Sequence, residues 1–200
     1  MMAPRVLSGW AEPAAILGGA LWVPHAVFEM LRPWGAAMVY QEERGYDLIT
    51  NTALFVAYGL PGSLAQLLTS LGLLGIAARL GLPVRRTGKA GLIVANVAVG
   101  LGVLSLLGVI VLVAALFAAG LAFGSVFVGA AAFLLGLDAW RTGVASRWAV
   151  ALLILGLIGL FMLPLRPLVY AVELVPPAAG AAFIGLFGLA WISVGFALRR

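Results

Sequence analysis

The chain contains no cysteine and a single histidine, His25. The absence of cysteine excludes disulfide bonds, thiol chemistry and cysteine-ligated zinc or iron–sulfur centres. One histidine also cannot supply the several imidazoles of a multi-histidine metal site or a bis-histidine haem site within one chain. The sequence therefore predicts neither a metal centre nor a bound cofactor.

Charged residues are also scarce. They make up 10% of the 200 residues, and hydrophobic residues make up 64%, whereas soluble domains are about 25% charged and about 45–50% apolar. This composition leaves no room for a soluble catalytic domain. The basic residues are scattered between apolar runs, which argues against a nucleic-acid-binding surface. The runs are continuous rather than alternating, so they favour membrane helices over barrel strands.

The apolar runs predict an all-α polytopic membrane protein with a single transmembrane domain over residues 1–200. A helix that crosses a bilayer needs about 20 apolar residues. The uncharged stretch 90–137 would be roughly 70 Å long as one helix, against a hydrocarbon core of about 30 Å. It therefore predicts two helices and a turn around Gly120. Six spans are expected, at approximately 13–32, 50–78, 90–114, 119–138, 148–164 and 178–198.

Three segments allow more than one interpretation. The first run could be a signal peptide, but it lacks a clear small-residue cleavage site, which favours a retained helix. Pro61 predicts a kink in the second span, the alternatives being a short interfacial helix before the crossing or a broken helix as in transporters. Pro164 is expected to end the fifth span. Residues 165–176 then predict an outer interfacial helix or a plain loop. Residues 33–47 are expected to form a loop with aromatic side chains at the membrane interface.

The charge distribution predicts the orientation. Six spans place nine basic residues on the side of the termini: Arg5, Arg79, Arg85, Arg86, Lys89, Arg141, Arg147, Arg199 and Arg200. Three lie on the other side: Arg32, Arg44 and Arg166. The positive-inside rule then places both termini in the cytoplasm, most simply across a bacterial cytoplasmic (inner) membrane. Arg85, Arg86 and Lys89 could also contact anionic lipid headgroups.

A group of polar residues is predicted near the outer side. His25, Glu29 and Arg32 lie on neighbouring turns of one helix face. Such residues at membrane depth are costly and usually have partners. They indicate either a proton- or ligand-binding site that opens outwards, or a Glu29–Arg32 pair at the interface with His25 bonded to a neighbour. Further candidates for the same pocket are Asn51, Tyr58, Arg166, Tyr170 and Glu173.

The stretch 90–137 has few polar side chains, namely Asn96, Ser105 and Ser125. A path for an ionic solute needs polar lining, so this hairpin is expected to be dry. Its glycines, including Gly120 and Gly124, would let helices approach closely and could support a homo-oligomer.

The sequence carries no paired-aspartate motif and no Gly-x-Ser-x-Gly elbow. A hydrolase would have to use His25 with a serine such as Ser63, and another enzyme could use His25 and Glu29 as acid and base. We expect instead a non-enzymatic accessory subunit of a membrane complex, with the bilayer and a protein as partners. The alternative is a small-solute binding or transport protein with an outward-facing polar pocket on the first two helices.

Overall fold

The computed structural model describes residues 4–31, 36–43, 45–143, 146–171 and 177–199, with side chains over 8–31, 36–43, 45–143, 148–161 and 180–199. The described chain is almost entirely helical, as the sequence predicts. Its helices are α1 (Pro4–Leu31), α3 (Thr52–Arg79), α4 (Arg86–Ile110), α5 (Ala114–Thr142), α6 (Ser146–Ala171) and α7 (Pro177–Ala197). Two short strands, β1 (Met38–Gln41) and β2 (Tyr46–Ile49), lie between α1 and α3.

Five of the helices are long and apolar enough to cross a membrane. These spans are Ser8–Leu31, Thr52–Arg79, Arg86–Ile110, Ala114–Thr142 and Gly180–Ala197. In α6 the described apolar stretch, Trp148–Phe161, is shorter than the others. The protein therefore has the helices of an integral membrane protein.

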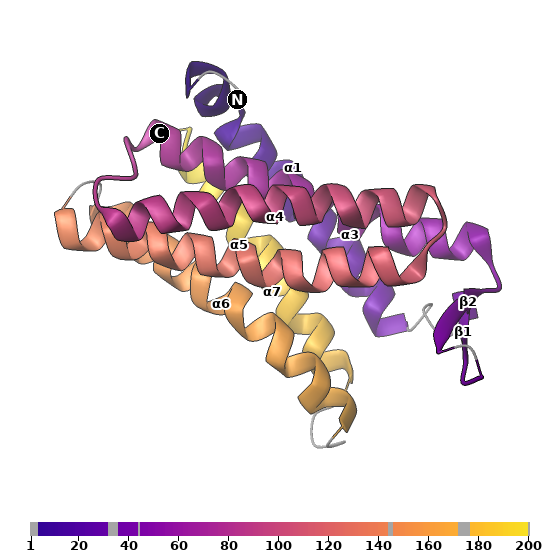
Figure 1. Cartoon of the computed structure of the whole chain (residues 1–200). Coiled ribbons are helices and arrows are strands. Elements are labelled where there is room, and N and C mark those ends of the chain that lie inside the picture. Colours follow the sequence, from indigo (N-terminus) through magenta and orange to yellow (C-terminus); the bar gives the residue numbers. More distant parts are fainter. Residues whose placement is uncertain (1–3, 32–35, 44, 144–145, 172–176, 200) are drawn as a thin grey trace.

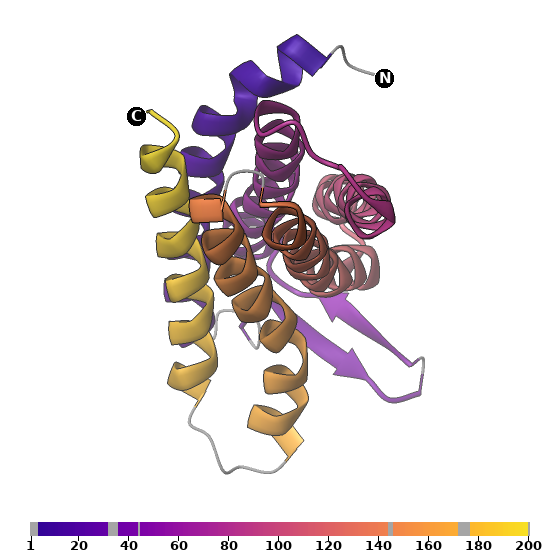
Figure 2. The same ribbon diagram turned by 90° about the vertical axis from the view of Figure 1, so that its left-hand side faces the viewer.

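The helices form one closed circuit. Each packs against the next in chain order, α7 returns to α1, and α3 also contacts α5 inside the circuit. In Figure 2, α3, α4 and α5 are seen close to end-on while α6 and α7 run down the page, so the two groups cross obliquely. Both termini lie at the same end of the bundle (Figure 1).

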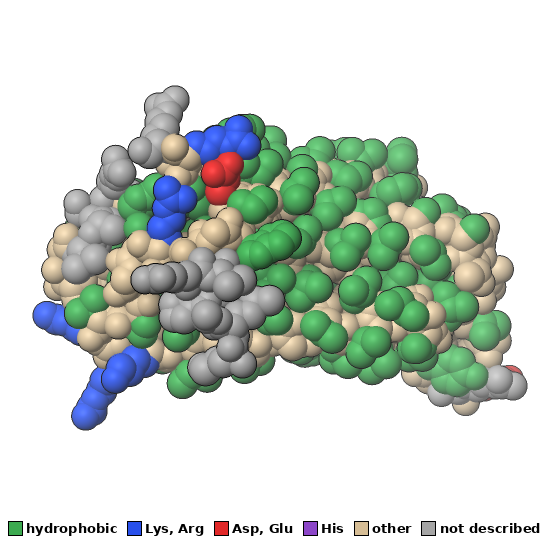
Figure 3. Space-filling view, turned by 90° about the horizontal axis from the view of Figure 1, so that it is seen from above, with side chains coloured by type: hydrophobic (Ala, Val, Ile, Leu, Met, Phe, Trp, Pro, Cys, Tyr) green, Lys and Arg blue, Asp and Glu red, His purple; other side chains and the backbone are tan. Residues whose placement is uncertain are grey.

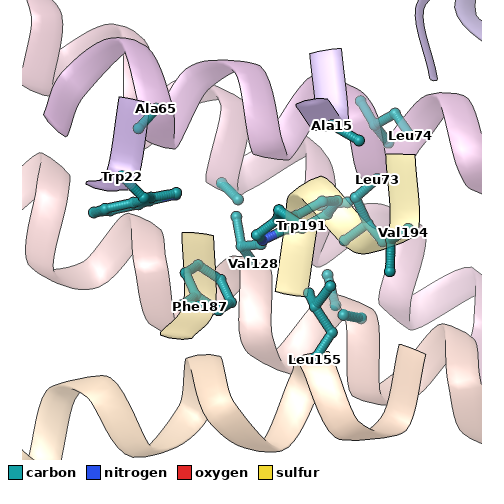
Figure 4. Packing of buried hydrophobic residues seen from close by; sticks show 14 of the residues in the cluster. Ala15, Trp22, Ala65, Leu73, Leu74, Val128, Leu155, Phe187, Trp191 and Val194 are labelled. Carbon is teal, nitrogen blue, oxygen red and sulfur yellow. The ribbon is translucent and has the colours of Figure 1, made fainter. Parts of the chain in front are cut away.

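Bulky aromatic residues and small residues fill the interior together. Trp22 of α1 and Phe187 of α7 meet edge to face with ring centroids 5.8 Å apart, and Trp191 follows at 6.2 Å from Phe187. Figure 4 shows these rings among small and aliphatic side chains from other helices, including Ala65, Val128 and Leu155. Small residues allow the helix backbones to approach closely in a bilayer, where dispersion contacts hold helices together.

Residues 38–49 form a β-hairpin rather than the predicted loop. β1 and β2 pair antiparallel in the register Met38↔Ile49 to Gln41↔Tyr46. Gly45 has a φ of +68° in the turn, a conformation that glycine adopts without strain. The signal was present in the sequence, because two short runs rich in aliphatic and aromatic residues flank four residues that contain a glycine.

The turn between α4 and α5 lies at residues 111–113, so its predicted position around Gly120 was wrong. Leu112 takes the left-handed conformation there, with a φ of 57°. Gly120 lies instead inside α5. A Cβ at that position would be 2.5 Å from the backbone nitrogen of Ser105 and 2.7 Å from the carbonyl oxygen of Leu101. The glycine marks where α4 and α5 cross, not where the chain reverses.

Prolines interrupt neither α3 nor α6. α3 is one helix through Pro61, which is inconsistent with a separate interfacial helix before that residue. α6 continues through Pro164 to Ala171, beyond the predicted end of the fifth span. The remainder of the predicted outer helix, residues 172–176, lies outside the described residues. In a bilayer, neighbouring helices and local adjustments re-satisfy the backbone groups that proline frees.

Candidate functional site

His25 lies at the crossing of α1 and α3, fully buried. Its Nδ1 is 3.4 Å from the carbonyl oxygen of Tyr58. Since a carbonyl can only accept, the geometry assigns the proton of a neutral ring to Nδ1. Pro61, three residues after Tyr58, has no N–H to donate to the Ala57 carbonyl one turn back in α3. Gly62 makes room for the imidazole: a Cβ there would lie 2.8 Å from both Cε1 and Nδ1.

Glu29 and Tyr58 extend this site towards the end of the bundle that carries the β-hairpin. The Tyr58 hydroxyl donates to Glu29 Oε1 over 2.5 Å, in a half-buried position. The Tyr58 ring lies 5.0 Å from the His25 imidazole, centroid to centroid. Three of the predicted site residues thus converge: two lie one turn apart on α1, and the third comes from α3. We call this group the His25–Tyr58–Glu29 site.

Aromatic rings enclose the site. Trp22 packs edge to face against His25 with centroids 5.7 Å apart, and Phe117 of α5 packs in the same way against Tyr58 at 5.8 Å. The indole Nε1 of Trp22 is buried, and no described residue accepts its proton. A buried donor without an acceptor is uncommon and costly. The aromatic rings of Trp22 and Phe117 lower the local polarity, which strengthens any hydrogen bond made inside the site.

Of the other predicted site residues, Asn51 has a described side chain, and it does not join this group. Asn51 is exposed and caps α3, since its Oδ1 accepts from the Leu54 backbone N–H over 3.0 Å. Its role is therefore to satisfy an N-terminal donor of the helix. Arg166 and Tyr170 belong to the last turns of α6, but their side chains lie outside the described residues, as do Arg32 and Glu173.

A second buried polar site, centred on Asp138, was not predicted. Asp138 of α5 is fully buried and accepts from the backbone N–H of Val84 at 2.7 Å and of Arg85 at 3.0 Å. The Thr87 hydroxyl lies 3.2 Å away. Arg85 is the N-cap of α4 and its own side chain makes no cap hydrogen bond. Asp138, which belongs to α5, caps the N-terminus of α4 instead. Its negative charge is favourable there because the N-terminus of a helix carries a partial positive charge.

Two observations could have indicated this role in the sequence. Asp138 is the sole acidic residue between positions 48 and 172, and it stands at the end of an apolar run. The start of α4 lacks a capping side chain of its own, with Arg85 and Arg86 where serine, threonine or aspartate is usual. The pairing of the two segments could not be read from their spacing, because they are more than fifty positions apart in the chain.

Other buried polar groups bond between or within helices. The Ser63 and Ser105 hydroxyls lie 2.8 Å apart and join α3 to α4, and Ser105 also donates to the Phe117 carbonyl at 3.2 Å. Thr69 and Ser70 bond to carbonyls one turn back on α3. Gly124 packs against Gln66, with a virtual Cβ 2.6 Å from Nε2. These groups serve helix packing, and Gly120 and Gly124 are used inside the bundle rather than on its outer surface.

Positive charge gathers at one end of the bundle. Arg79, Arg85, Arg86, Lys89 and Arg141 are exposed around the two loops that flank α4 and α5 at this end. Figure 3 shows the Lys and Arg side chains of one face at that end, beside a broad hydrophobic surface. Arg199 pairs here with Glu12 and joins α7 to α1. Arg85, Arg86 and Lys89 are therefore exposed at the same end of the bundle as Arg141 and the Arg199–Glu12 pair.

The described residues contain no cluster of three or more His, Asp or Glu side chains able to hold a metal ion. Comparisons with models of protein families, with curated proteins and with solved structures found no match to this chain.

Proposed function

We propose that this protein is a non-enzymatic accessory subunit of a membrane complex, embedded in a bacterial cytoplasmic membrane. The observation that carries the proposal is the close packing of the described helices where they cross. At the crossings, backbones approach so closely that a single Cβ would clash, as at Gly120 with Ser105, Gly129 with Gly159 and Gly19 with Gly188. A path for a hydrated solute needs polar lining and space. A bundle packed in this way is better suited to presenting fixed outer faces to a partner.

In this proposal the chain crosses the membrane six times, with both termini in the cytoplasm. α6 is 26 residues long, and about 20 residues suffice to cross the hydrocarbon core. The exposed basic residues near Val84 and Arg141 supply the positive charge that the cytoplasmic side requires. The β-hairpin, with Glu42 and Glu43 at its turn, then lies outside.

Cysteine labelling tests this orientation without background, because the chain has no cysteine of its own. Glu43→Cys should react with a membrane-impermeant maleimide on intact cells. Val84→Cys and Arg199→Cys should react only after the membrane is opened. Because Val84 and Arg199 should lie on the same side of the membrane, protection of both also shows that the number of spans between them is even. Labelling of Val84→Cys from outside would contradict the orientation.

Native mass spectrometry of the protein extracted gently from its own membrane tests the accessory role. We expect a reproducible second polypeptide of different mass bound to the chain. Denatured protein taken through the same extraction is the control for non-specific adducts. A chain that carries no other polypeptide in several mild detergents and in nanodiscs would contradict an accessory role.

A second candidate function, small-solute binding, is favoured by the convergence of the His25–Tyr58–Glu29 site. The buried Trp22 Nε1 beside it offers a further donor to a ligand. In the same mass spectra, this function would appear as a small molecule bound to a lone chain. His25→Ala and Glu29→Gln should each remove that mass, whereas Glu43→Gln on the hairpin should keep it.

A further inference from the structure

The outer face of α4 carries a regular stripe of exposed residues. α4 packs against α3 and α5; it lies at the front of the bundle in Figure 1 and at its right-hand edge in Figure 2. On the side away from those contacts the exposed positions are separated alternately by three and four residues. We call them the α4 stripe: Ile93, Asn96, Gly100, Val103, Leu107 and Ile110.

The alternation of three and four is the repeat of a coiled coil. Residues spaced by 3.5 on average stay on one side of a helix that winds gently around a partner, and each side chain fits between four of the partner's. Left-handed packing of this kind is common between membrane helices. The stripe runs along most of α4, from Ile93 to Ile110 within Arg86–Ile110, so it offers a continuous seam.

A polar side chain at position 96 is energetically unfavourable on this exposed face of α4. It lies ten positions after the start of α4, about 15 Å along the helix axis, and therefore within the apolar part of the span. Its Nδ2 donates to the Leu92 carbonyl over 2.8 Å, but no described residue donates to its Oδ1. Hydrocarbon offers no partner either, and an unpaired polar group there is unfavourable. By contrast, the exposed Ser193 on α7 donates its one hydroxyl proton to the Leu189 carbonyl, so its donor has a partner within the helix.

Gly100, one turn further along, leaves space beside Asn96. A Cβ at Gly100 would meet nothing within 4 Å, unlike the buried glycines at the helix crossings. Within the monomer this glycine has no packing role, yet it costs helix stability relative to alanine. Between two helices, a small residue permits close approach of the backbones and brings neighbouring polar side chains within reach.

We propose that the α4 stripe is a homodimer interface, occupied by α4 of a second copy with the two Asn96 amides hydrogen-bonded to each other. All copies of a chain insert with the same orientation, so two α4 helices can meet about a two-fold axis along the membrane normal only in parallel. Each stripe residue then meets its own counterpart. Two carboxylates or two ammonium groups that face each other across the axis would repel. Two amides can pair there, because each both donates and accepts a hydrogen bond. The same contacts form whichever way the chain is oriented in the membrane.

Disulfide cross-linking in native membranes tests the interface. In the cysteine-free chain, Gly100→Cys should form a disulfide-linked dimer on mild oxidation. The matched control is Phe161→Cys, which is also exposed and lies 15 positions after the start of α6, as Gly100 lies 14 positions after the start of α4. It should stay monomeric. Equal cross-linking of both variants, none for Gly100→Cys, or an adduct of Gly100→Cys with another polypeptide would overturn the proposal.

The role of the amide is tested by the dimer dissociation constant in detergent, measured by energy transfer between labelled copies. Asn96→Leu should raise it about three- to twentyfold, the range expected for interhelical hydrogen bonds in membranes. Val97→Leu, on the same helix but beside the stripe, should leave it within twofold. Gly100→Leu should prevent dimerisation while the melting temperature of the monomer stays unchanged. An Asn96→Leu protein that dimerises as tightly as the parent would contradict the pairing.

Discussion

Replacing Gly120 with alanine should destabilise the protein by about 3 kcal/mol or prevent it from folding. The added Cβ would lie 2.5 Å from the Ser105 nitrogen and 2.7 Å from the Leu101 oxygen. Both atoms belong to the backbone of α4, so no side chain can rotate away and the two helices must separate. Overpacking in tightly packed interiors costs about 1–3 kcal/mol, and more where the neighbours cannot move. Thermal unfolding in detergent, followed by circular dichroism, measures the loss.

Gly9→Ala is the matched control for this prediction. The substitution is chemically the same, but a Cβ at Gly9, in α1 and away from the α4 stripe, meets open space. Alanine also favours a helix over glycine by about 1 kcal/mol, so the control should be neutral or slightly stabilising. If the two variants melt at the same temperature, the α4–α5 crossing does not depend on backbone contact at Gly120.

Asp138→Ala should cost about 3 kcal/mol. The carboxylate holds the backbone N–H groups of Val84 and Arg85 at the start of α4, and the Thr87 hydroxyl as well. Hydrogen bonds to a charged acceptor contribute about 1.5–3 kcal/mol, and unpaired buried donors add a penalty. We also expect the connection between α3 and α4 to become sensitive to proteolysis, because its main anchor on α5 is lost. Melting temperature and limited proteolysis measure the two effects.

Two further variants separate the contributions at Asp138. Asp138→Asn keeps one carbonyl acceptor and should lose about half as much stability as Asp138→Ala. Glu42→Ala removes an exposed carboxylate from the hairpin turn and should change the melting temperature little. A stable Asp138→Ala protein with an unchanged proteolysis pattern would show that the loop folds without this anchor.

Most of the helical content was predictable because it depends on local properties. A run of about 20 apolar residues must form a helix in a bilayer, since every backbone group needs a partner there. The ends of helices were harder to predict. The stretch 90–137 was expected to turn around Gly120 because it is too long for one span, yet the turn occurs at Leu112, where nothing in the local sequence requires it. Only the register of α4 against α5 decides where the chain can reverse.

The same division applies to the candidate site. His25 and Glu29 share a helix face by their spacing alone. Tyr58 joins them because α3 crosses α1 at the level of Pro61 and Gly62, where the helix surface is hollow enough for an imidazole. Asn51 was grouped with these residues by its position in the chain, but its amide caps α3 instead. A polar residue near a helix start has a local use that competes with any distant site.

The sequence alone determined that the helices are apolar enough for a bilayer, that the fold is helical, and how the charges are distributed along the chain. These properties follow from the hydropathy and charge of each residue by itself. Which small residues face inwards was decided by the tertiary structure. Gly120 and Gly124 pack against neighbouring helices inside the bundle, whereas Gly100 and Asn96 lie on its outer surface. Asp138 likewise acquires its role only when α5 lies against the start of α4. Helix crossings bring distant residues within hydrogen-bond range, and their geometry follows from how all the side chains of the bundle pack together.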